Sequence, residues 1–329
     1  MGGAEWVGPE QYRDELRLFS YLVSGSLHES ERVVEDVLAG AAGGPPSAEP
    51  ITRESMYALS AEACLQRLAG RPRRGLPSLT RPPSDPSSPP DRDADASAWV
   101  EPFPDSLFPE RFALDAPVSE YTARESSSLF MAAALQEVTP LARAAFVLAD
   151  LLCWRTAAAA EVLGSEERET GAALDEARGT VTRSYRAELG RREPPPERDA
   201  TSLSMRYLYP WETADLEGLL ARLTADVTFQ RPPSPSWYRG AEAFRRFASE
   251  HLLPEGSRGR WRLLPLRASG QLGFGAYRVD STRRVYLAHS IQVLFFDGGL
   301  VSEIVCFADA GLFPLFGLLP EVAVQGSIE

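Results

Sequence analysis

The side chains best suited to chemistry lie near the C-terminal end of the chain, around His289. Apolar residues recur from Val285 to Phe296 and predict a strand, and Asp297-Gly298-Gly299 predicts the hairpin turn into a second strand. If the hairpin loop holds an even number of residues, alternation gathers one apolar face: Leu287, His289, Ile291, Val293, Phe295, Ile304, Cys306 and Ala308. The other face then carries Tyr286, Ser290, Gln292, Glu303 and Asp309.

His289 would be the one ionisable group on an otherwise apolar face. Burial shifts the pKa of such a group, and this is one way to place a general acid or base. A histidine in this setting is more often a core residue with satisfied hydrogen bonds, so both interpretations stay open. Tyr277 and Asp309 complete the candidate catalytic set, although alternation places Asp309 opposite His289 unless a strand end or a bulge intervenes.

Aromatic side chains in the same region predict a ligand pocket. Its candidate lining residues are Trp211, Trp237, Tyr238, Ile291, Gln292 and Cys306. Their rings could stack on an aromatic or polyene ligand, or they could simply form core. No Ser-His-Asp arrangement, Walker A loop or metal cluster can be made from these residues. We therefore expect no metal and no cofactor, and any reaction would be acid–base work: isomerisation, cyclisation, dehydration or hydrolysis.

The rest of the chain divides into segments that must position these residues. Helical periodicity marks residues 1–75 and 119–192, and a change of period after residue 204 predicts helices followed by strands up to residue 322. Residues 76–118 are dense in Pro, Ser, Asp and Arg and predict a linker, as do residues 193–203. Within the first linker, Trp99-Val-Glu-Pro-Phe-Pro-Asp105 is aromatic enough that we expect it to dock on a neighbouring domain.

The charge of the chain is unevenly distributed. The net charge of −12 lies entirely in residues 1–200, because residues 201–329 carry 13 arginines against 13 acidic residues. Lys and Arg supply most of the affinity of proteins for DNA phosphates, so an acidic first part argues against ordinary DNA binding. The chain shows no signal peptide and no membrane-spanning run, and we expect a cytoplasmic protein. Its three cysteines are too widely spaced to predict a zinc site or a disulfide framework.

Several motifs make the chain resemble a known family. Trp237-Tyr-Arg-Gly240, Ile291-Gln-Val-Leu294 and the segment 310–317, with the motif at Trp99–Asp105, are similar to the extracytoplasmic-function (ECF) sigma factors that carry a C-terminal SnoaL-like domain. The resemblance implies a multidomain α and α+β protein: two all-helical sigma-like domains, the second a helix-turn-helix, followed by an NTF2/SnoaL-like α+β cone. It also implies a pocket for a small apolar or polyketide-like metabolite, and Asp309 resembles the acid that ends this strand in many SnoaL-like enzymes.

The residues that act in the family are altered in this sequence. Arg32 stands where the polymerase-binding helix of the family carries an aspartate, and the next helix keeps Tyr57 but lacks the family's Trp and Arg. The expected recognition helix starts near Ser165, and its first turn holds three glutamates that oppose DNA phosphates: Glu166, Glu167 and Glu169. Alternatively, Ser165 caps the helix and the acids only complement the helix dipole.

Two functions follow from these observations. In the first, the sigma-like part has lost ordinary promoter recognition, and the SnoaL-like domain binds a small metabolite. The domain could also transform that metabolite, as a cyclase, isomerase or hydrolase of secondary metabolism. In the second, the chain is a working sigma factor that binds RNA polymerase core and promoter DNA and is regulated by its C-terminal domain. The arginines that would then contact DNA are Arg168, Arg178, Arg183 and Arg186. A weaker third interpretation is a scaffold that pairs with another protein through the acidic half.

Overall fold

The chain forms two compact units in the computed structural model. Residues 8–43, 51–87, 96–109, 125, 127–184 and 197–324 are described. The first unit joins Met1–Arg74 with Leu107–Ala187, and the second joins Gly75–Ser106 with Glu188–Glu329. The expected linker of residues 76–118 is therefore divided between the units, and most of its described part belongs to the second.

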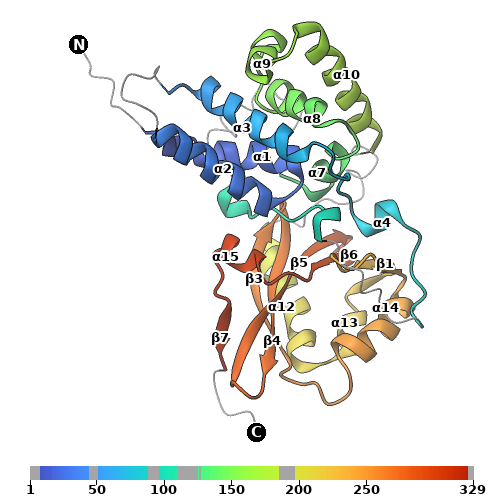
Figure 1. Ribbon diagram of the computed structural model, residues 1–329. Helices are drawn as coiled ribbons and strands as arrows, with labels where there is room; N and C mark the ends of the chain where they lie inside the picture. The colour runs from blue at the N-terminus through green and yellow to red at the C-terminus, as the bar shows by residue number, and fades with distance from the viewer. Residues whose placement is uncertain are drawn as a thin grey trace. The chain divides into compact units, whose positions relative to one another are not determined.

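The first unit opens with three helices, drawn in blue in Figure 1: α1 (Arg13–Ser24), α2 (Leu27–Ala42) and α3 (Arg53–Leu68). A 3-10 turn, η1 (Pro9–Tyr12), precedes them. Gly25 ends α1 in the left-handed region at φ 71°, which a residue without Cβ adopts most readily. Ser26 then caps α2 by accepting a hydrogen bond from the Glu29 amide. These caps explain the abrupt change of direction between the first two helices.

The second group of helices in this unit contains a helix-turn-helix. It comprises α7 (Leu129–Leu135), α8 (Pro140–Phe146), the π-helical turn η5 (Val147–Leu151), α9 (Thr156–Leu163) and α10 (Glu167–Ser184). Gly164, at φ 60°, makes the turn between α9 and α10. The recognition helix begins at Glu167, so Ser165 does not serve as its N-cap as expected. The Ser165 hydroxyl instead lies 2.6 Å from that of Thr170.

The two helical groups pack together in the first unit. The buried guanidinium of Arg143 in α8 connects them. It donates to the carbonyl of Val23 in α1 at 2.9 Å, to the Gln136 side chain at 2.6 Å, and to the carbonyls of Val138 at 3.1 Å and Gln136 at 3.2 Å. Burial, with smaller effects of Arg73 and Arg74, lowers the pKa of Arg143 to about 10.

The second unit is a curved sheet with its longer helices on one face and a short helix on the other. Its helices are α4 (Pro77–Thr80), α12 (Glu197–Thr213), α13 (Leu216–Leu220), α14 (Ala241–Phe247) and α15 (Leu312–Leu315), with η2 (Ala96–Ala98), η3 (Asp105–Leu107, at the unit boundary) and the π-turn η6 (Ala248–Leu252). Its strands are β1 (Leu223–Gln230), β2 (Trp237–Arg239), β3 (Trp261–Ala268), β4 (Gln271–Asp280), β5 (Val285–Asp297), β6 (Leu300–Phe307) and β7 (Glu321–Ala323). The sheet order is β2-β1-β6-β5-β4-β3, with β7 on the first part of β5. Only the β1–β6 pair is parallel among these described strands.

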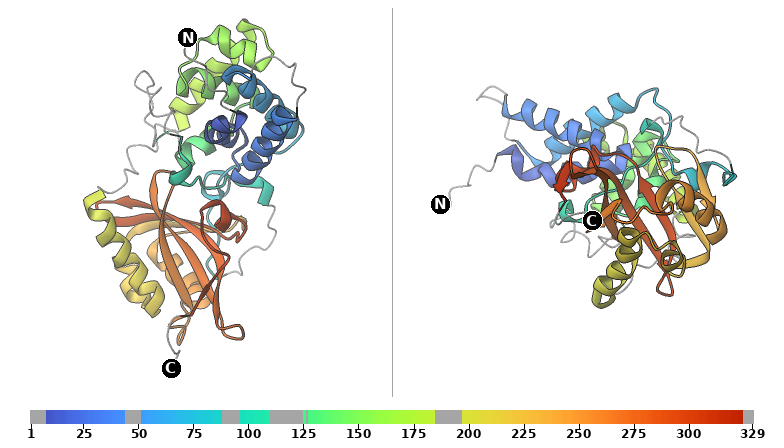
Figure 2. Two further views of the ribbon diagram at one scale, coloured as in Figure 1. Left: turned by 90° about the vertical axis from the view of Figure 1, so that its left-hand side faces the viewer. Right: turned by 90° about the horizontal axis from the view of Figure 1, so that it is seen from below.

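The two faces of this sheet have different coverings. Helices α12, α13 and α14 lie against one face, here called the inner face (Figures 1 and 2). The core between them includes Tyr207, Trp211, Phe244, Phe274 and Trp261. On the opposite, outer face, α15 and the residues after it pack so closely that a Cβ on Gly275 would lie 2.5 Å from Leu318 Cδ1. A side chain at position 275 would displace that covering.

Two β-bulges set which side chains share a face. The hairpin loop after β5 has two residues, Gly298 and Gly299, because Asp297 pairs with Leu300. One pair further on, the register shifts: Phe296 pairs with Val301 but Phe295 pairs with Glu303. The extra residue turns the rest of β6 over. The expected sharing of a face by Ile291, His289, Ile304 and Cys306 was therefore wrong beyond this point, since Cys306 pairs with Gln292 and Ile304 with Leu294.

Candidate functional site

His289 lies in the second bulge, at the rim of the inner face. Ser290 pairs with Ala276 whereas Ala288 pairs with Tyr277, so His289 is the extra residue of β5. The bulge lets the imidazole reach Trp261 of the inner core, edge to face, with ring centroids 4.9 Å apart. Its Nδ1 lies 3.2 Å from the Ser290 hydroxyl. Strict alternation along β5 could not have placed both His289 and Ser290 on this side.

The surroundings of His289 keep its imidazole neutral. Burial, helped by the guanidinium groups of Arg231, Arg278 and Arg260, lowers the pKa of His289 to about 4. Within the described residues, no carboxylate is among the groups that shift the pKa of this ring. At neutral pH the ring therefore has one N–H to donate and a lone pair of low basicity, which suits hydrogen bonding better than proton abstraction.

The other two candidate catalytic residues lie away from His289. Tyr277 is on the outer face, where its ring packs against Phe313 at 4.9 Å and its hydroxyl donates to the Leu319 carbonyl at 2.9 Å. Burial raises the pKa of Tyr277. Asp309 follows β6, and its Oδ1 accepts a hydrogen bond from the Gly311 amide at 2.8 Å. The three residues do not converge on one site, and their catalytic role stays a prediction.

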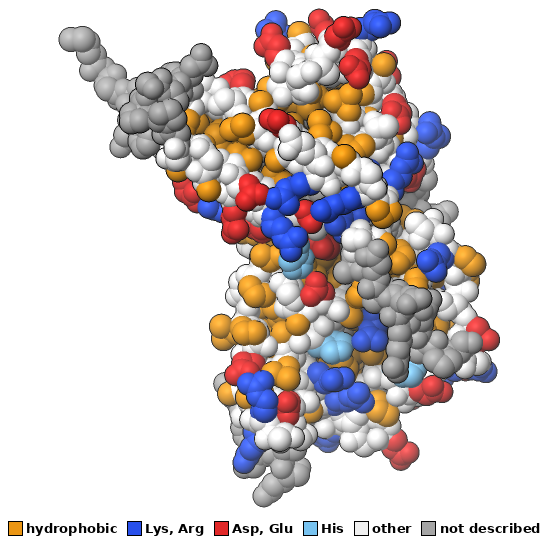
Figure 3. Space-filling view, viewed as in Figure 1, with side chains coloured by type: hydrophobic (Ala, Val, Ile, Leu, Met, Phe, Trp, Pro, Cys, Tyr) orange, Lys and Arg blue, Asp and Glu red, His pale blue; other side chains and the backbone are white. Residues whose placement is uncertain are grey.

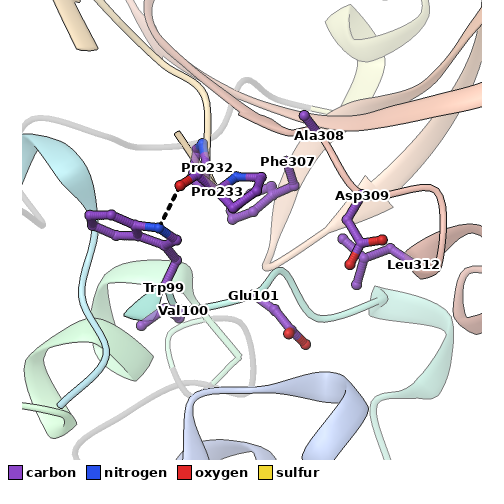
Figure 4. Close-up of a pocket in the computed structure, with 9 residues that line it drawn as sticks. All are labelled: Trp99, Val100, Glu101, Pro232, Pro233, Phe307, Ala308, Asp309 and Leu312. Carbon is purple, nitrogen blue, oxygen red and sulfur yellow. Dashed lines mark hydrogen bonds between the residues drawn. The ribbon is translucent and has the colours of Figure 1, made fainter. Parts of the chain in front are cut away.

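Asp309 instead lines a pocket of about 240 Å³ in the second unit. Figure 4 shows Asp309 and Leu312 at one end of this pocket and Trp99 with Pro233 at the other. The remaining lining residues are Val100, Glu101, Pro232, Phe307 and Ala308. The Trp99 indole donates to the Pro233 carbonyl at 2.8 Å, so the pocket is built partly from the aromatic motif that the sequence singled out.

That motif is bound to the sheet along its length. The Ser269 amide donates to the Phe103 carbonyl at 2.7 Å, and the Phe103 amide donates to the Ser269 hydroxyl at 3.1 Å. The Gly270 amide donates to Asp105 Oδ1 at 2.8 Å. The side chain of Phe103 is fully buried. The segment 99–105 is thus an integral part of the second unit.

The residues predicted to line a ligand pocket are divided between different surroundings. Trp211, Tyr238 and Cys306 belong to the buried inner core. Gln292 is also internal, and its Oε1 accepts a hydrogen bond from the Tyr207 hydroxyl at 2.9 Å. Ile291 pairs with Gly275 and Phe307 on the outer face, and the Trp237 indole donates to the Arg81 carbonyl at 2.9 Å. Their role in ligand binding stays a prediction.

The groups around His289 that sequence reasoning missed are Trp261 and three arginines, Arg231, Arg260 and Arg278. A signal for part of this set was present, since Arg260-Trp261-Arg262 interleaves an aromatic residue with basic ones. The antiparallel pairing of Trp261 with Arg278 depends on the β3–β4 register. Arg231 reaches the site from the end of β1, which only the sheet order brings near β5.

In the first unit, Arg32, at the position that the resemblance assigns to polymerase binding, and Tyr57, at one that it assigns to opening of the promoter −10 element, are both engaged with their own neighbours. Arg32 Nη1 lies 3.3 Å from Glu29 Oε1, so its reversed charge is partly neutralised. Tyr57 is fully buried, and its hydroxyl donates to Glu15 at 3.1 Å. Arg53 pairs with the same carboxylate at 2.6 Å and lies over the Tyr57 ring. These side chains stabilise the packing of α3.

The helix-turn-helix presents mainly acidic side chains. Glu166, Glu167 and Glu169 are exposed, and Figure 3 shows acidic side chains gathered at the end of the helical unit that carries α9 and α10. Among the arginines expected to contact DNA, Arg168 is exposed, and Arg183 donates to the Thr180 hydroxyl at 3.1 Å. Arg178 is bound to Asp150 at 2.7 Å, whereas Arg186 lies outside the described residues.

Along the described part of the chain, no group of three or more His, Cys, Asp or Glu side chains is arranged to hold a metal ion. No described helix is both long enough and apolar enough to span a bilayer. Cys64, Cys153 and Cys306 are all free thiols.

A helical unit with a helix-turn-helix, followed by a curved sheet with helices on one face, defines a protein of the sigma-factor type with an added α+β domain. A model of the SnoaL-like domain family matches residues 205–304. Over 315 residues the chain is 33% identical to the ECF RNA polymerase sigma factor SigG of Mycobacterium tuberculosis, covering 94% of this chain and 82% of that protein. The chain belongs to the ECF family of RNA polymerase sigma factors.

A solved structure has the same fold. The crystal structure of the Mycobacterium tuberculosis extracytoplasmic function sigma factor SigJ matches with a TM-score of 0.54 at 22% identity, covering 93% of this chain and 96% of that one. The predicted fold class, helical sigma-like parts followed by an NTF2/SnoaL-like α+β domain, is confirmed.

Proposed function

We propose that the chain is a working ECF sigma factor, whose helical unit binds RNA polymerase core and promoter DNA and whose SnoaL-like domain regulates it. The observation that carries the proposal is 33% identity over 94% of the chain to a sigma factor, including the helix-turn-helix. This family membership favours the second of the two functions drawn from the sequence over the loss of promoter recognition. In this proposal, the residues that differ from the family pattern at the polymerase and promoter contacts are part of how the activity of the factor is controlled.

The acidic recognition helix supports a factor that binds DNA weakly by itself. Three exposed glutamates in and before the first turn of α10 repel phosphates, and Arg178 is held by Asp150. Promoter binding would then depend on attachment to the polymerase, which supplies its own DNA contacts. Such dependence limits binding of the free factor to DNA.

The packing of the helical unit supports a closed resting state. Trp154, just before α9, contacts the ring of Tyr57 in α3 at 5.2 Å, and Arg53 lies over Trp154 at 5.8 Å. Tyr57 is the residue that the family places at the promoter −10 element, and here it is buried in this contact. Promoter opening therefore requires the contact between α3 and the segment before α9 to separate, and a regulator can act on that equilibrium.

A direct test is transcription in vitro by core RNA polymerase with the purified full chain on a library of randomised promoter fragments. We expect the chain to co-purify with the core enzyme and to yield transcripts from a recurring sequence class. The substitution Trp154→Ala should raise transcription by loosening the closed state, whereas Trp237→Phe, in the second unit, serves as an aromatic control. Failure to bind core polymerase, or transcripts without a common sequence, would overturn the proposal.

Transformation of a metabolite by the SnoaL-like domain has less support. A cyclase or isomerase that uses His289, Tyr277 and Asp309 needs these groups around one substrate. Their positions on opposite faces of the sheet and beyond β6 do not provide this arrangement. The geometry therefore gives little support to catalysis by these three residues.

A further inference from the structure

The rim of the inner face in the second unit carries three arginines beside His289. Arg278 stands directly opposite Trp261 in the β3–β4 pair. The guanidinium carbon of Arg260 lies 5.9 Å from the centre of the Trp261 ring. Arg231 follows β1 and acts electrostatically on His289, Tyr238 and Cys306. Figure 3 shows arginine side chains gathered beside a histidine over this unit.

The three arginines differ in burial: Arg278 is exposed, whereas Arg231 and Arg260 are partly buried. Arg231 Nε is buried and has no hydrogen-bond partner. Across the described ranges, none of Arg231, Arg260 and Arg278 forms an ion pair or a side-chain hydrogen bond. Elsewhere in the same unit, arginines such as Arg245 and Arg262 are paired with Glu217 and Glu212. A buried guanidinium N–H without an acceptor is costly, and an anion would satisfy it.

Apolar and aromatic groups adjoin this positive rim. Trp261 presents its ring to His289, and Trp211 lies behind it with ring centroids 5.7 Å apart. Because the pKa of His289 is about 4, its ring adds a neutral N–H at physiological pH without adding charge. The rim thus offers guanidinium donors and one partly exposed, neutral imidazole ring, with the buried Trp261 ring behind it, and these groups together suit a planar organic anion better than a bare inorganic one.

We propose that this rim binds a small aromatic carboxylate, whose carboxylate group is held by Arg231 and Arg278 and whose ring lies against His289, with the buried Trp261 ring behind it. The site goes beyond the proposed sigma-factor function and does not depend on it. It is also separate from the pocket that contains Asp309, since none of its residues lines that pocket.

The test is a titration of the full chain with indole-3-carboxylate, followed by isothermal calorimetry and by NMR of histidine-labelled protein, in which only three residues give imidazole signals. We expect a dissociation constant of about 0.1–1 mM, as is usual for a ligand of this size, and a shift of the His289 signals. Arg231→Gln and Arg278→Gln should each weaken binding about 10-fold or more, because each removes a charge-assisted hydrogen bond. Arg278 is exposed, so its variant keeps the test valid if Arg231→Gln does not fold.

The matched control is Arg262→Gln, one residue from Trp261 on the same strand but paired with Glu212, and it should change the affinity by less than about 2-fold. Three ligand arms separate the sources of affinity: indole-3-carboxamide removes the charge, cyclohexanecarboxylate removes the aromatic ring, and inorganic phosphate removes the organic body. Each should bind at least about 5-fold more weakly than indole-3-carboxylate. No binding, equal binding of the carboxamide or of phosphate, or an equal loss in Arg262→Gln would overturn the site. None of these outcomes depends on RNA polymerase, so they are independent of the transcription test.

Discussion

Replacing Arg143 by methionine should destabilise the helical unit by about 3–5 kcal/mol. The guanidinium makes four hydrogen bonds, to the carbonyls of Val23, Gln136 and Val138 and to the side chain of Gln136. Leaving four buried acceptors unpaired costs about 1.5–2 kcal/mol each, or about 6–8 kcal/mol together. Methionine also removes a buried charge, whose pKa of about 10 against an ordinary 12.5 corresponds to about 3 kcal/mol regained. The difference is the predicted loss.

The assay is hydrogen exchange followed by mass spectrometry, because a whole-chain unfolding curve would mix the transitions of two units. In Arg143→Met, amides at the end of α1 around Val23 should exchange about 100-fold or more faster than in the wild type. Arg178→Met is the control: Arg178 also has its guanidinium held by hydrogen bonds, in its case to the Asp150 carboxylate, but its side chain is 51% exposed, so its loss should cost about 1 kcal/mol or less. Equal protection of α1 in Arg143→Met and wild type, or equal effects of the two variants, would refute the reasoning.

Three further predictions use other parts of the molecule. The pKa of His289 is about 4 in the folded protein and about 6.5 in the unfolded chain, so the neutral ring contributes fully to the stability above pH 6.5, and this contribution falls by about 2 kcal/mol by pH 5. His289→Gln should therefore reduce the dependence of the melting temperature on pH over this range, and a pH profile equal to that of the wild type would contradict the prediction. Replacing Glu166, Glu167 and Glu169 together by Gln should tighten promoter binding by the holoenzyme and steepen its salt dependence, as measured by anisotropy from 50 to 300 mM salt; unchanged affinity would count against DNA contact by this helix. Gly275→Leu should lower the melting temperature by several degrees through its clash with Leu318, whereas Gly171→Ala, in open space on an ordinary helical backbone, should not lower it; equal melting temperatures would show that the covering of the outer face yields freely.

The hairpin of β5 and β6 shows how far sequence patterns reach. Apolar periodicity and Asp297-Gly298-Gly299 correctly placed two strands joined by a hairpin turn, whose length of two residues only the structure gives. Counting faces by alternation failed at the first bulge, because one extra residue at Ser302 inverts every later side chain of β6. The second bulge acts the other way: it turns His289 toward Trp261, a contact that strict alternation would exclude. Bulges depend on packing against neighbouring strands and leave little trace in a single sequence.

The organisation of the chain into units was likewise predicted only in part from the sequence. Composition separated a Pro- and Ser-rich segment from the helices, and its aromatic motif indicated a docking role. The hydrogen bonds of Trp99 and Phe103 place this motif on the sheet unit, while Arg143 and Trp154 join the two helical groups that the sequence separates. In each of these contacts the two residues are roughly 100 or more positions apart in the sequence, so local composition could not predict them.

The sequence by itself determined the class of protein. The order of its segments, the helix-turn-helix, the strand pattern and the excess of acids at α9 and α10 are local properties that propensity and charge express directly. The tertiary structure alone decided which side chains meet: Tyr57 in a buried contact, Asp309 in a pocket with Trp99, and His289 among unpaired arginines. The physical reason is that proximity depends on strand register, bulges and helix packing, which are settled by the burial of the whole core and not by any one segment.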